Sequence, residues 1–133
     1  MRNMKYSNQK HIYVLIKRNE LSGINIEDGS KHIEKAIFST ERLLVGNFSV
    51  AEDALRIIAK KITRQASWWY KPPLKVVMHP LEMNEGGLSE VEYRAIRELG
   101  LSAFLKANVR SVVVWNGKDL SQEEIRNCEE NIE

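Results

Sequence analysis

One stretch of the chain, residues 74–100, constrains the fold more than any other. It begins with the apolar run Leu74–Pro80, whose β-branched residues predict a buried strand. A loop with two glycines follows at residues 81–87, and a helix start follows at Ser89. In an α/β domain, a strand, a glycine-bearing loop and a helix start in that order place a pocket at the carboxyl end of the strand. The stretch therefore predicts a fold class and a location for a site, without naming the chemistry of that site.

Three strands are expected before this stretch. The aromatic and β-branched residues 11–16 predict the first strand. Residues 21–27 alternate between apolar and polar, which is typical of a half-buried strand with Asn25 on its polar face. The dipeptide at residues 28–29, Asp-Gly, predicts a hairpin turn into a third strand at residues 33–39.

Three capping boxes predict three helix starts. In each box a serine precedes a glutamate by three residues, so that the serine oxygen and the carboxylate each satisfy a free backbone amide. The boxes begin at Ser49, Ser89 and Ser121, and the first two helices are expected over residues 49–64 and 89–99. Gly100 is either the end of the second helix or a point within a longer one. A fifth strand is expected at residues 111–115.

The predicted element order is therefore β-β-β-α-β-α-β-α. An antiparallel meander followed by strand-helix-strand units indicates an α/β fold with a mixed five-stranded sheet and helices on its faces. At 133 residues the chain is expected to form one domain over residues 1–133, with residues 1–10 expected to be disordered.

The charge of the chain is small overall but uneven. The formal net charge of +2 gives no global reason to expect a nucleic-acid partner. Residues 1–80 carry 14 basic and 7 acidic side chains, a net charge of +7, whereas residues 81–133 carry 6 basic and 11 acidic side chains, a net charge of −5. This asymmetry indicates either a dipolar surface or two solvated faces of opposite sign.

The cysteine content and the hydropathy of the chain indicate a cytoplasmic protein. A single cysteine, Cys128, cannot form an internal disulfide, which suits a reducing compartment. The first residues lack the apolar segment of a secretory leader, so no signal peptide is expected. No apolar run approaches the roughly 20 residues of a membrane span, so no transmembrane segment is expected.

Two resemblances are carried by specific runs. The run Leu-Glu-Met-Asn-Glu-Gly-Gly-Leu-Ser at residues 81–89, together with residues 41–44 and 47–48, resembles the small uncharacterised enterobacterial proteins of the YjaA type, over most of residues 12–100. More weakly, the helix at residues 91–98, the strand before it and the helix start at residues 47–52 resemble the first domain of the MreB-type bacterial actin-like proteins. The second resemblance implies a ribonuclease-H-like, actin-type α/β domain, which agrees with the element order.

The chain departs from the actin-like pattern where nucleotide chemistry would take place. The first strand ends in Lys-Arg-Asn-Glu at residues 17–20, where that family has an Asp-Leu-Gly phosphate turn. The family's Glu-Pro is replaced by Asn-Gly-Lys at residues 116–118, and its first-helix aspartate by Asn47. No glycine-rich phosphate-loop motif occurs either. A two-metal nuclease would need converging carboxylates, and the first strand has none. We therefore expect no ATP binding, no cofactor, no catalytic residue and no enzymatic activity.

No metal ligands are expected. The three histidines, His11, His32 and His79, match no ligand spacing and are expected to be solvent-exposed or locally hydrogen-bonded.

Two groups of residues are candidates for a binding role. The first is the loop after the buried strand, with binding residues Glu82, Asn84, Glu85, Gly86 and Gly87. Its two carboxylates argue against an anionic ligand and favour a basic or amide-rich protein segment. The second group is an aromatic segment with a basic neighbour, expected to contact a partner: Trp68, Trp69, Tyr70 and Arg64.

Three functions follow as hypotheses. The first is a non-enzymatic interaction or adaptor protein, a lone actin-like domain with an unknown protein partner. The second is a small-ligand-binding or enzymatic domain that uses the crevice at residues 82–87. The third, which we expect least, is a weak nucleic-acid binder through the basic helix at residues 56–64 and the segment at residues 68–71.

Overall fold

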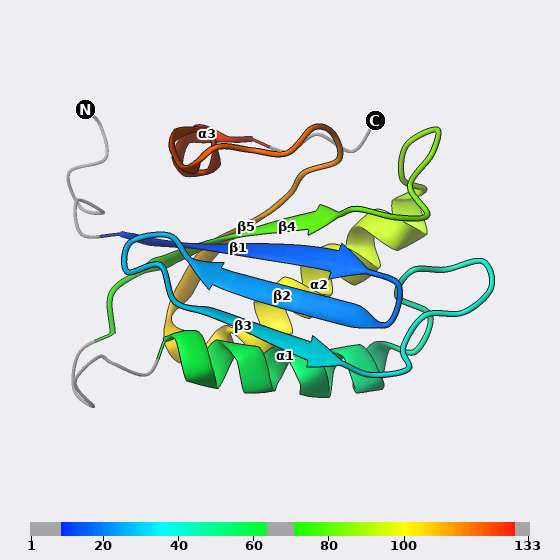
Figure 1. Cartoon of the computed structure of the whole chain (residues 1–133), viewed down its shortest axis with the longest axis horizontal. Coiled ribbons are helices and arrows are strands. Elements are labelled where there is room, and N and C mark those ends of the chain that lie inside the picture. Colours follow the sequence, from blue (N-terminus) through cyan, green and yellow to red (C-terminus); the bar gives the residue numbers. More distant parts are fainter. Residues whose placement is uncertain (1–8, 64–70, 130–133) are drawn as a thin grey trace.

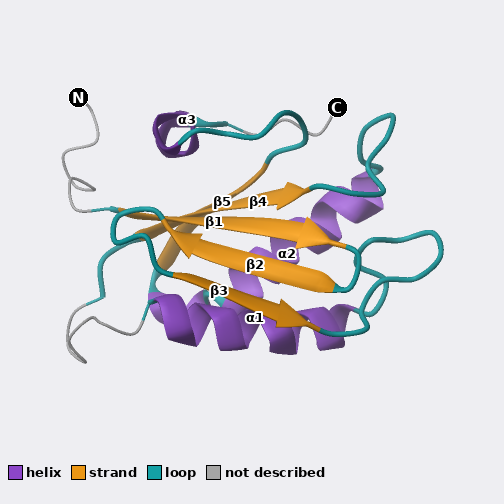
Figure 2. Ribbon diagram, in the orientation of Figure 1, coloured by secondary structure: helices purple, strands orange, loops and turns teal. Residues whose placement is uncertain are grey.

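Five strands form one mixed sheet in the order β3-β2-β1-β4-β5 (Figures 1 and 2). The computed structural model describes residues 9–63 and 71–129. The strands are β1 (Lys10–Lys17), β2 (Glu20–Asn25), β3 (Lys31–Lys35), β4 (Leu74–Pro80) and β5 (Val109–Val114). The helices are α1 (Phe48–Ile62), α2 (Glu90–Ala103), α3 (Gln122–Asn127) and the short 3-10 helix η2 (Leu105–Ala107). The predicted element order and the α/β fold class are confirmed.

The sheet combines an antiparallel half with a parallel half. β2 pairs antiparallel with both β1 and β3, whereas β1 pairs parallel with β4, and β4 pairs parallel with β5. The carboxyl ends of β1, β3, β4 and β5 therefore lie at one end of the molecule, and their amino ends lie at the other. β4 is buried along its whole length, as its apolar composition predicts.

Helices α1 and α2 cover one face of the sheet, and α3 lies on the other face (Figure 1). The main apolar core lies between the sheet and α1 with α2, and it contains Ile12, Leu55 and Leu99, all fully buried. A smaller apolar cluster, which includes Tyr13 and Ile125, lies between the sheet and α3. Among the described residues, no helix combines the length and the apolarity needed to cross a membrane.

The first predicted helix start is wrong by two residues. Asn47, not Ser49, is the N-cap of α1, and its side chain accepts a hydrogen bond from the backbone N–H of Val50. The capping-box pattern that begins at Ser49 is coincidental, because its glutamate has another role. Glu52 accepts a hydrogen bond from the hydroxyl of Ser102 in α2 and forms an ion pair with Arg56 at 3.2 Å. Glu52 therefore joins the two helices.

The other two predicted capping boxes are confirmed. Ser89 caps α2 and Ser121 caps α3, each with the reciprocal glutamate bond. Gly100 lies inside α2, which continues to Ala103. A β-carbon at Gly100 would lie 2.9 Å from Val112, so the glycine lets α2 approach the sheet closely.

The hairpin between β2 and β3 occurs where the Asp-Gly pair predicts it, but both strands have other bounds than expected. β2 ends at Asn25, and β3 ends at Lys35 because its partner strand ends there. Residues 38–39 do not extend the strand, since their backbone amides donate to the side chain of Asn19 at 3.0 and 2.8 Å. The polar face of β2 is also not in solvent. Asn25 is 2% exposed and donates to the carbonyl of Ile62 at the end of α1.

Candidate functional site

The loop between β4 and α2 lies at the carboxyl end of the parallel strands, where the sequence predicts a site. Figure 1 shows it at the same end of the molecule as the loop that follows β3. The backbone N–H of Leu81 donates to the carbonyl of Ile16 at 2.9 Å, which fixes the start of the loop to β1.

The side chain of Asn84 fastens the middle of this loop. Its amide nitrogen donates to the carbonyl of Pro80 at 2.8 Å and to the side-chain oxygen of Asn116 at 2.7 Å. The backbone carbonyl of Asn84 accepts a hydrogen bond from the backbone N–H of Gly87 at 3.2 Å. The polar groups of this predicted binding residue thus bond within the protein and join the end of β4 to the segment after β5.

Arg18 and Glu82 form a second set of contacts that hold this loop in place. The carboxylate of Glu82 accepts a hydrogen bond from the backbone N–H of Arg18 at 2.6 Å. The guanidinium of Arg18 donates to the carbonyl of Thr40 at 2.9 Å and contacts the sulfur of Met83 at 3.2 Å. Arg18 therefore connects three loops, those after β1, β3 and β4. The sequence does not reveal the bond between Arg18 and Glu82, because the two residues are 64 positions apart.

Backbone strain is concentrated in the same loop. Met83 has a φ of 57°, in the left-handed region that costs a non-glycine residue about 1–2 kcal/mol. Gly86 and Gly87 have φ values of 77° and 92°, which their lack of a β-carbon allows. The apolar part of Met83 packs against the core, and this packing with the bonds of Arg18 holds the strained conformation. Such strain is found preferentially at functional sites.

Three of the exposed side chains at this end of the molecule are together called the carboxyl-end surface: Ile37, Leu43 and Glu85. Ile37 is 81% exposed and Leu43 is 38% exposed. Glu85 is exposed, as is Gly86 beside it. Of the predicted loop residues, Glu82, Glu85 and Gly86 are exposed, whereas Asn84 and Gly87 are partly buried. Glu82 also bonds to the backbone of Arg18, and Asn84 bonds to Pro80 and Asn116. Ile37 and Leu43 were missed, because a lone apolar residue in a loop is not distinguished by its sequence from a core residue.

The predicted partner-contact residues Arg64, Trp68, Trp69 and Tyr70 lie outside the described residues. The basic helix predicted at residues 56–64 corresponds to the second half of α1, where Lys60 and Lys61 are exposed in the last turn.

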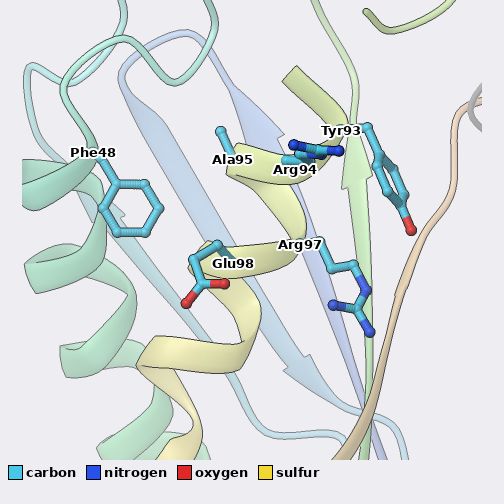
Figure 3. Close-up of a pocket in the computed structure, with 6 residues that line it drawn as sticks. All are labelled: Phe48, Tyr93, Arg94, Ala95, Arg97 and Glu98. Atoms are coloured by element: carbon cyan, nitrogen blue, oxygen red, sulfur yellow. The ribbon is translucent and has the colours of Figure 1, made fainter. Parts of the chain in front are cut away.

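An open hollow of about 710 Å³ lies between α1 and α2 (Figure 3). Figure 3 shows Phe48 of α1 and Glu98 of α2 on the side where the two helices face each other, whereas Tyr93 and Arg97 point away from Phe48. The neighbouring Arg94 is paired with Glu90 of the same helix at 2.9 Å. The sequence did not predict this hollow. Its polar groups do not converge on one point, so the hollow does not have the geometry of a catalytic site.

A buried polar pair lies on the other face of the sheet. His79 of β4 is fully buried, and its Nδ1 lies 2.5 Å from the hydroxyl of Tyr13 in β1. The His79 Nε2 faces the carbonyl of Gly117 at 3.0 Å, which can only accept, so Nε2 donates and Nδ1 accepts from Tyr13. Burial lowers the pKa of His79, and the bond to Gly117 opposes this shift. Burial also raises the pKa of Tyr13 to about 12, so the phenol stays protonated as the donor.

A lysine from the same strand holds α3. Lys75 is 9% exposed, and its ammonium group donates to the carbonyls of Arg126 and Cys128 at 2.9 and 3.0 Å. A cation at the carboxyl end of a helix is favoured by the helix dipole. Burial lowers the pKa of Lys75 and raises the pKa of the Cys128 thiol. A lysine within the apolar run of β4 is the sequence signal that could have indicated this role.

The histidines have different environments. His32 lies 2.7 Å from Glu34, a local bond of the expected kind. His11 is buried and lies 2.7 Å from Glu27, which is 16 positions away, so its bond is not local. The expectation of an exposed or locally bonded ring is also wrong for His79, because that ring is fully buried and bonds to Tyr13 and Gly117, which are 66 and 38 positions away. Within residues 9–63 and 71–129, no group of three or more His, Cys, Asp or Glu side chains is placed to hold a metal ion.

Comparison with known proteins gives one informative match. No protein-family model matches the chain. The chain is similar to the curated "Uncharacterized protein YjaA" of Escherichia coli (strain K12), with 37% identity over 97 residues, which span 71% of this chain and 76% of the relative. The expected resemblance to proteins of the YjaA type is confirmed.

Proposed function

We propose that this chain, which belongs to the YjaA family, is an interaction protein without catalytic activity, and that its carboxyl-end surface contacts a protein partner. The observation that supports this proposal is the fixation of three loops by Arg18, which bonds to Thr40 and contacts Met83. A loop that is already ordered before binding loses less conformational entropy on association.

The surface itself indicates the chemistry of the partner. Ile37 and Leu43 expose apolar area that would be desolvated in a complex. Glu85 adds an exposed negative charge at the same end of the molecule. A segment that places a basic side chain next to an apolar one would complement this surface in both respects.

We further propose that the domain is actin-like, of the ribonuclease-H-like type, and that it has lost the nucleotide. The element order and the mixed sheet support this assignment. The turn after β1, which the resemblance equates with a phosphate turn, has its amides engaged. The N–H of Arg18 donates to Glu82, and the N–H of Asn19 donates to the hydroxyl of Ser39 at 3.0 Å. A carboxylate thus bonds to an amide of the kind that binds phosphate in such a turn.

The use of the loop at residues 82–87 as a small-ligand or enzymatic crevice stays a prediction. Glu82 and Asn84 would have to break internal bonds to bind a ligand there. The interaction protein therefore agrees better with the geometry. A cytoplasmic location is part of the same proposal.

Affinity capture with a matched control tests the interaction. The purified protein carrying Ile37→Ser, Leu43→Ser and Glu85→Lys should lose a protein that the wild type enriches, as identified by mass spectrometry. The control carries Ile57→Ser and Leu105→Ser, which alter two other exposed apolar side chains, 42% and 71% exposed. The control should retain the partner.

A second measurement with the purified partner completes the test. Calorimetry should show at least about a tenfold loss of affinity for the surface variant, which corresponds to about 1.4 kcal/mol. Equal loss in both variants, or full binding by the surface variant, would place the contact elsewhere.

A further inference from the structure

Two segments of the chain that include β4 and β5 carry several cations and no acidic residue. Residues 54–81 have no aspartate or glutamate and carry Arg56, Lys60, Lys61, Arg64, Lys71 and Lys75. Residues 99–118 also have none and carry Lys106, Arg110 and Lys118. The small net charge of the whole chain does not show these acid-free segments. A charge count over residues 1–80 and 81–133 does not show them either, because one segment lies mainly in the first part and the other in the second.

The fold brings most of these cations to the amino end of β4 and β5. The last turn of α1, the start of β4 and the residue just before η2 contribute Ile62, Leu74 and Phe104 to one apolar core. The ammonium group of Lys71 donates to the carbonyl of Lys106 at 2.8 Å, which joins the start of β4 to η2. We call the exposed cations of this region the basic end: Lys60, Lys61, Lys71, Lys106 and Arg110.

The basic end forms a band rather than a point. The end of α1 lies over β2, because Asn25 of β2 donates to the carbonyl of Ile62 at 3.0 Å. Arg110 lies on β5, which is separated from β2 by three strand spacings. At about 4.8 Å per spacing, the band extends over about 14 Å.

The carboxylates of the β2–β3 hairpin, at the same end of the sheet, are already bonded. Glu27 bonds to His11 and lies 3.6 Å from Arg126, and Asp28 bonds to Ser30 at 2.7 Å. The ion pair with Arg126 offsets part of the effect of Glu27 on the positive potential of the band, whereas the bond to a neutral hydroxyl does not offset that of Asp28.

We propose that the basic end binds the phosphate backbone of nucleic acid without reading its sequence. Lysines and arginines that are exposed and spread over a band match a row of phosphates. Lysine is depleted at protein–protein interfaces, which makes a protein partner a poorer match. Binding to a membrane surface would require several apolar side chains that insert among the lipids. Leu105, which is 71% exposed, is one such side chain beside the cations of the basic end, so a membrane is the alternative that the experiment has to test.

Fluorescence anisotropy with labelled oligonucleotides tests this proposal. Single-stranded and duplex oligonucleotides of mixed sequence are titrated with the full chain at 50 and at 200 mM salt. The variant carries Lys60→Gln, Lys106→Gln and Arg110→Gln, and it retains Lys71, whose ammonium group bonds within the protein. The control carries Lys17→Gln, Lys35→Gln and Arg42→Gln, exposed cations at the opposite end of the sheet. The two variants remove the same charge, from the same residue types.

The wild type should bind in a strongly salt-dependent manner, and the control should bind like the wild type. Each contact removed in the variant should reduce the slope of log K against log salt by about 0.7 for single strands and about 0.9 for duplex. The variant should also bind about tenfold or more weakly at 50 mM salt. If its melting temperature falls, the variant Lys60→Gln, Lys61→Gln repeats the comparison.

Three outcomes would overturn the proposal. The first is no binding of either oligonucleotide by the wild type at 50 mM salt. The second is an equal loss of affinity in the variant and the control, which would show that binding depends on the net charge of the protein and not on the basic end. The third is binding to phosphatidylserine vesicles without binding to oligonucleotides, which would assign the basic end to a membrane surface.

Discussion

At the scale of single residues, Tyr13 and His79 connect the sheet to the segment after β5. The ring of His79 is neutral in the folded protein, because burial lowers its pKa. In the unfolded chain it takes up a proton near pH 6.5, so the unfolded state binds more protons below that pH. The free energy of unfolding should therefore decrease as the pH falls below about 6.5. Urea unfolding of the wild type and of His79→Gln between pH 7.5 and pH 5 should show the steeper decrease in the wild type. Parallel curves would contradict a buried neutral ring.

At the scale of elements, the packing of α1 on β2 depends on Gly23. A β-carbon at this position would lie 2.4 Å from a methyl group of Ile58. Gly23→Ala should therefore reduce the free energy of unfolding by about 1–3 kcal/mol through overpacking. Ile58→Ala alone should cost about 2–5 kcal/mol, because it leaves a cavity. In the double variant the new methyl group occupies part of that cavity, so its cost should be less than the sum by about 0.5 kcal/mol or more. Additive costs in chemical denaturation would show that the two residues do not compete for space.

At the scale of the whole molecule, the turn after β1, which the resemblance to actin-like proteins equates with a phosphate turn, is bonded to the loops after β3 and β4. The amides of Arg18 and Asn19 bond to side chains of other loops, and Glu82 adds a negative charge at the same turn. Calorimetry with ATP and magnesium should therefore show no binding tighter than about 1 mM, which corresponds to about 4 kcal/mol. Titration with magnesium alone serves as the control. Micromolar affinity for ATP would contradict the proposal that this domain does not bind nucleotide.

Local patterns in the sequence predicted the elements well, because each pattern reports on neighbours along the chain. The periodicity of two and the apolar run of β4 predicted the strands, and the boxes at Ser89 and Ser121 predicted two helix starts. The box at Ser49 failed for a reason outside its own segment. Its glutamate bonds to Ser102 of another helix, and Asn47 is the cap instead.

The sequence by itself determined the fold class, the order of the elements and the position of the loop after β4. Only the tertiary structure decided what the side chains of that loop do. Glu82 contacts Arg18 from 64 positions away, and His79 contacts Tyr13 from 66 positions away. Gly23 and Asn25 acquire their roles only when α1 is docked on β2. Strand register and helix docking follow from the packing of the whole core, whereas a local pattern depends on a few adjacent residues, so contacts across that core cannot be derived from the pattern.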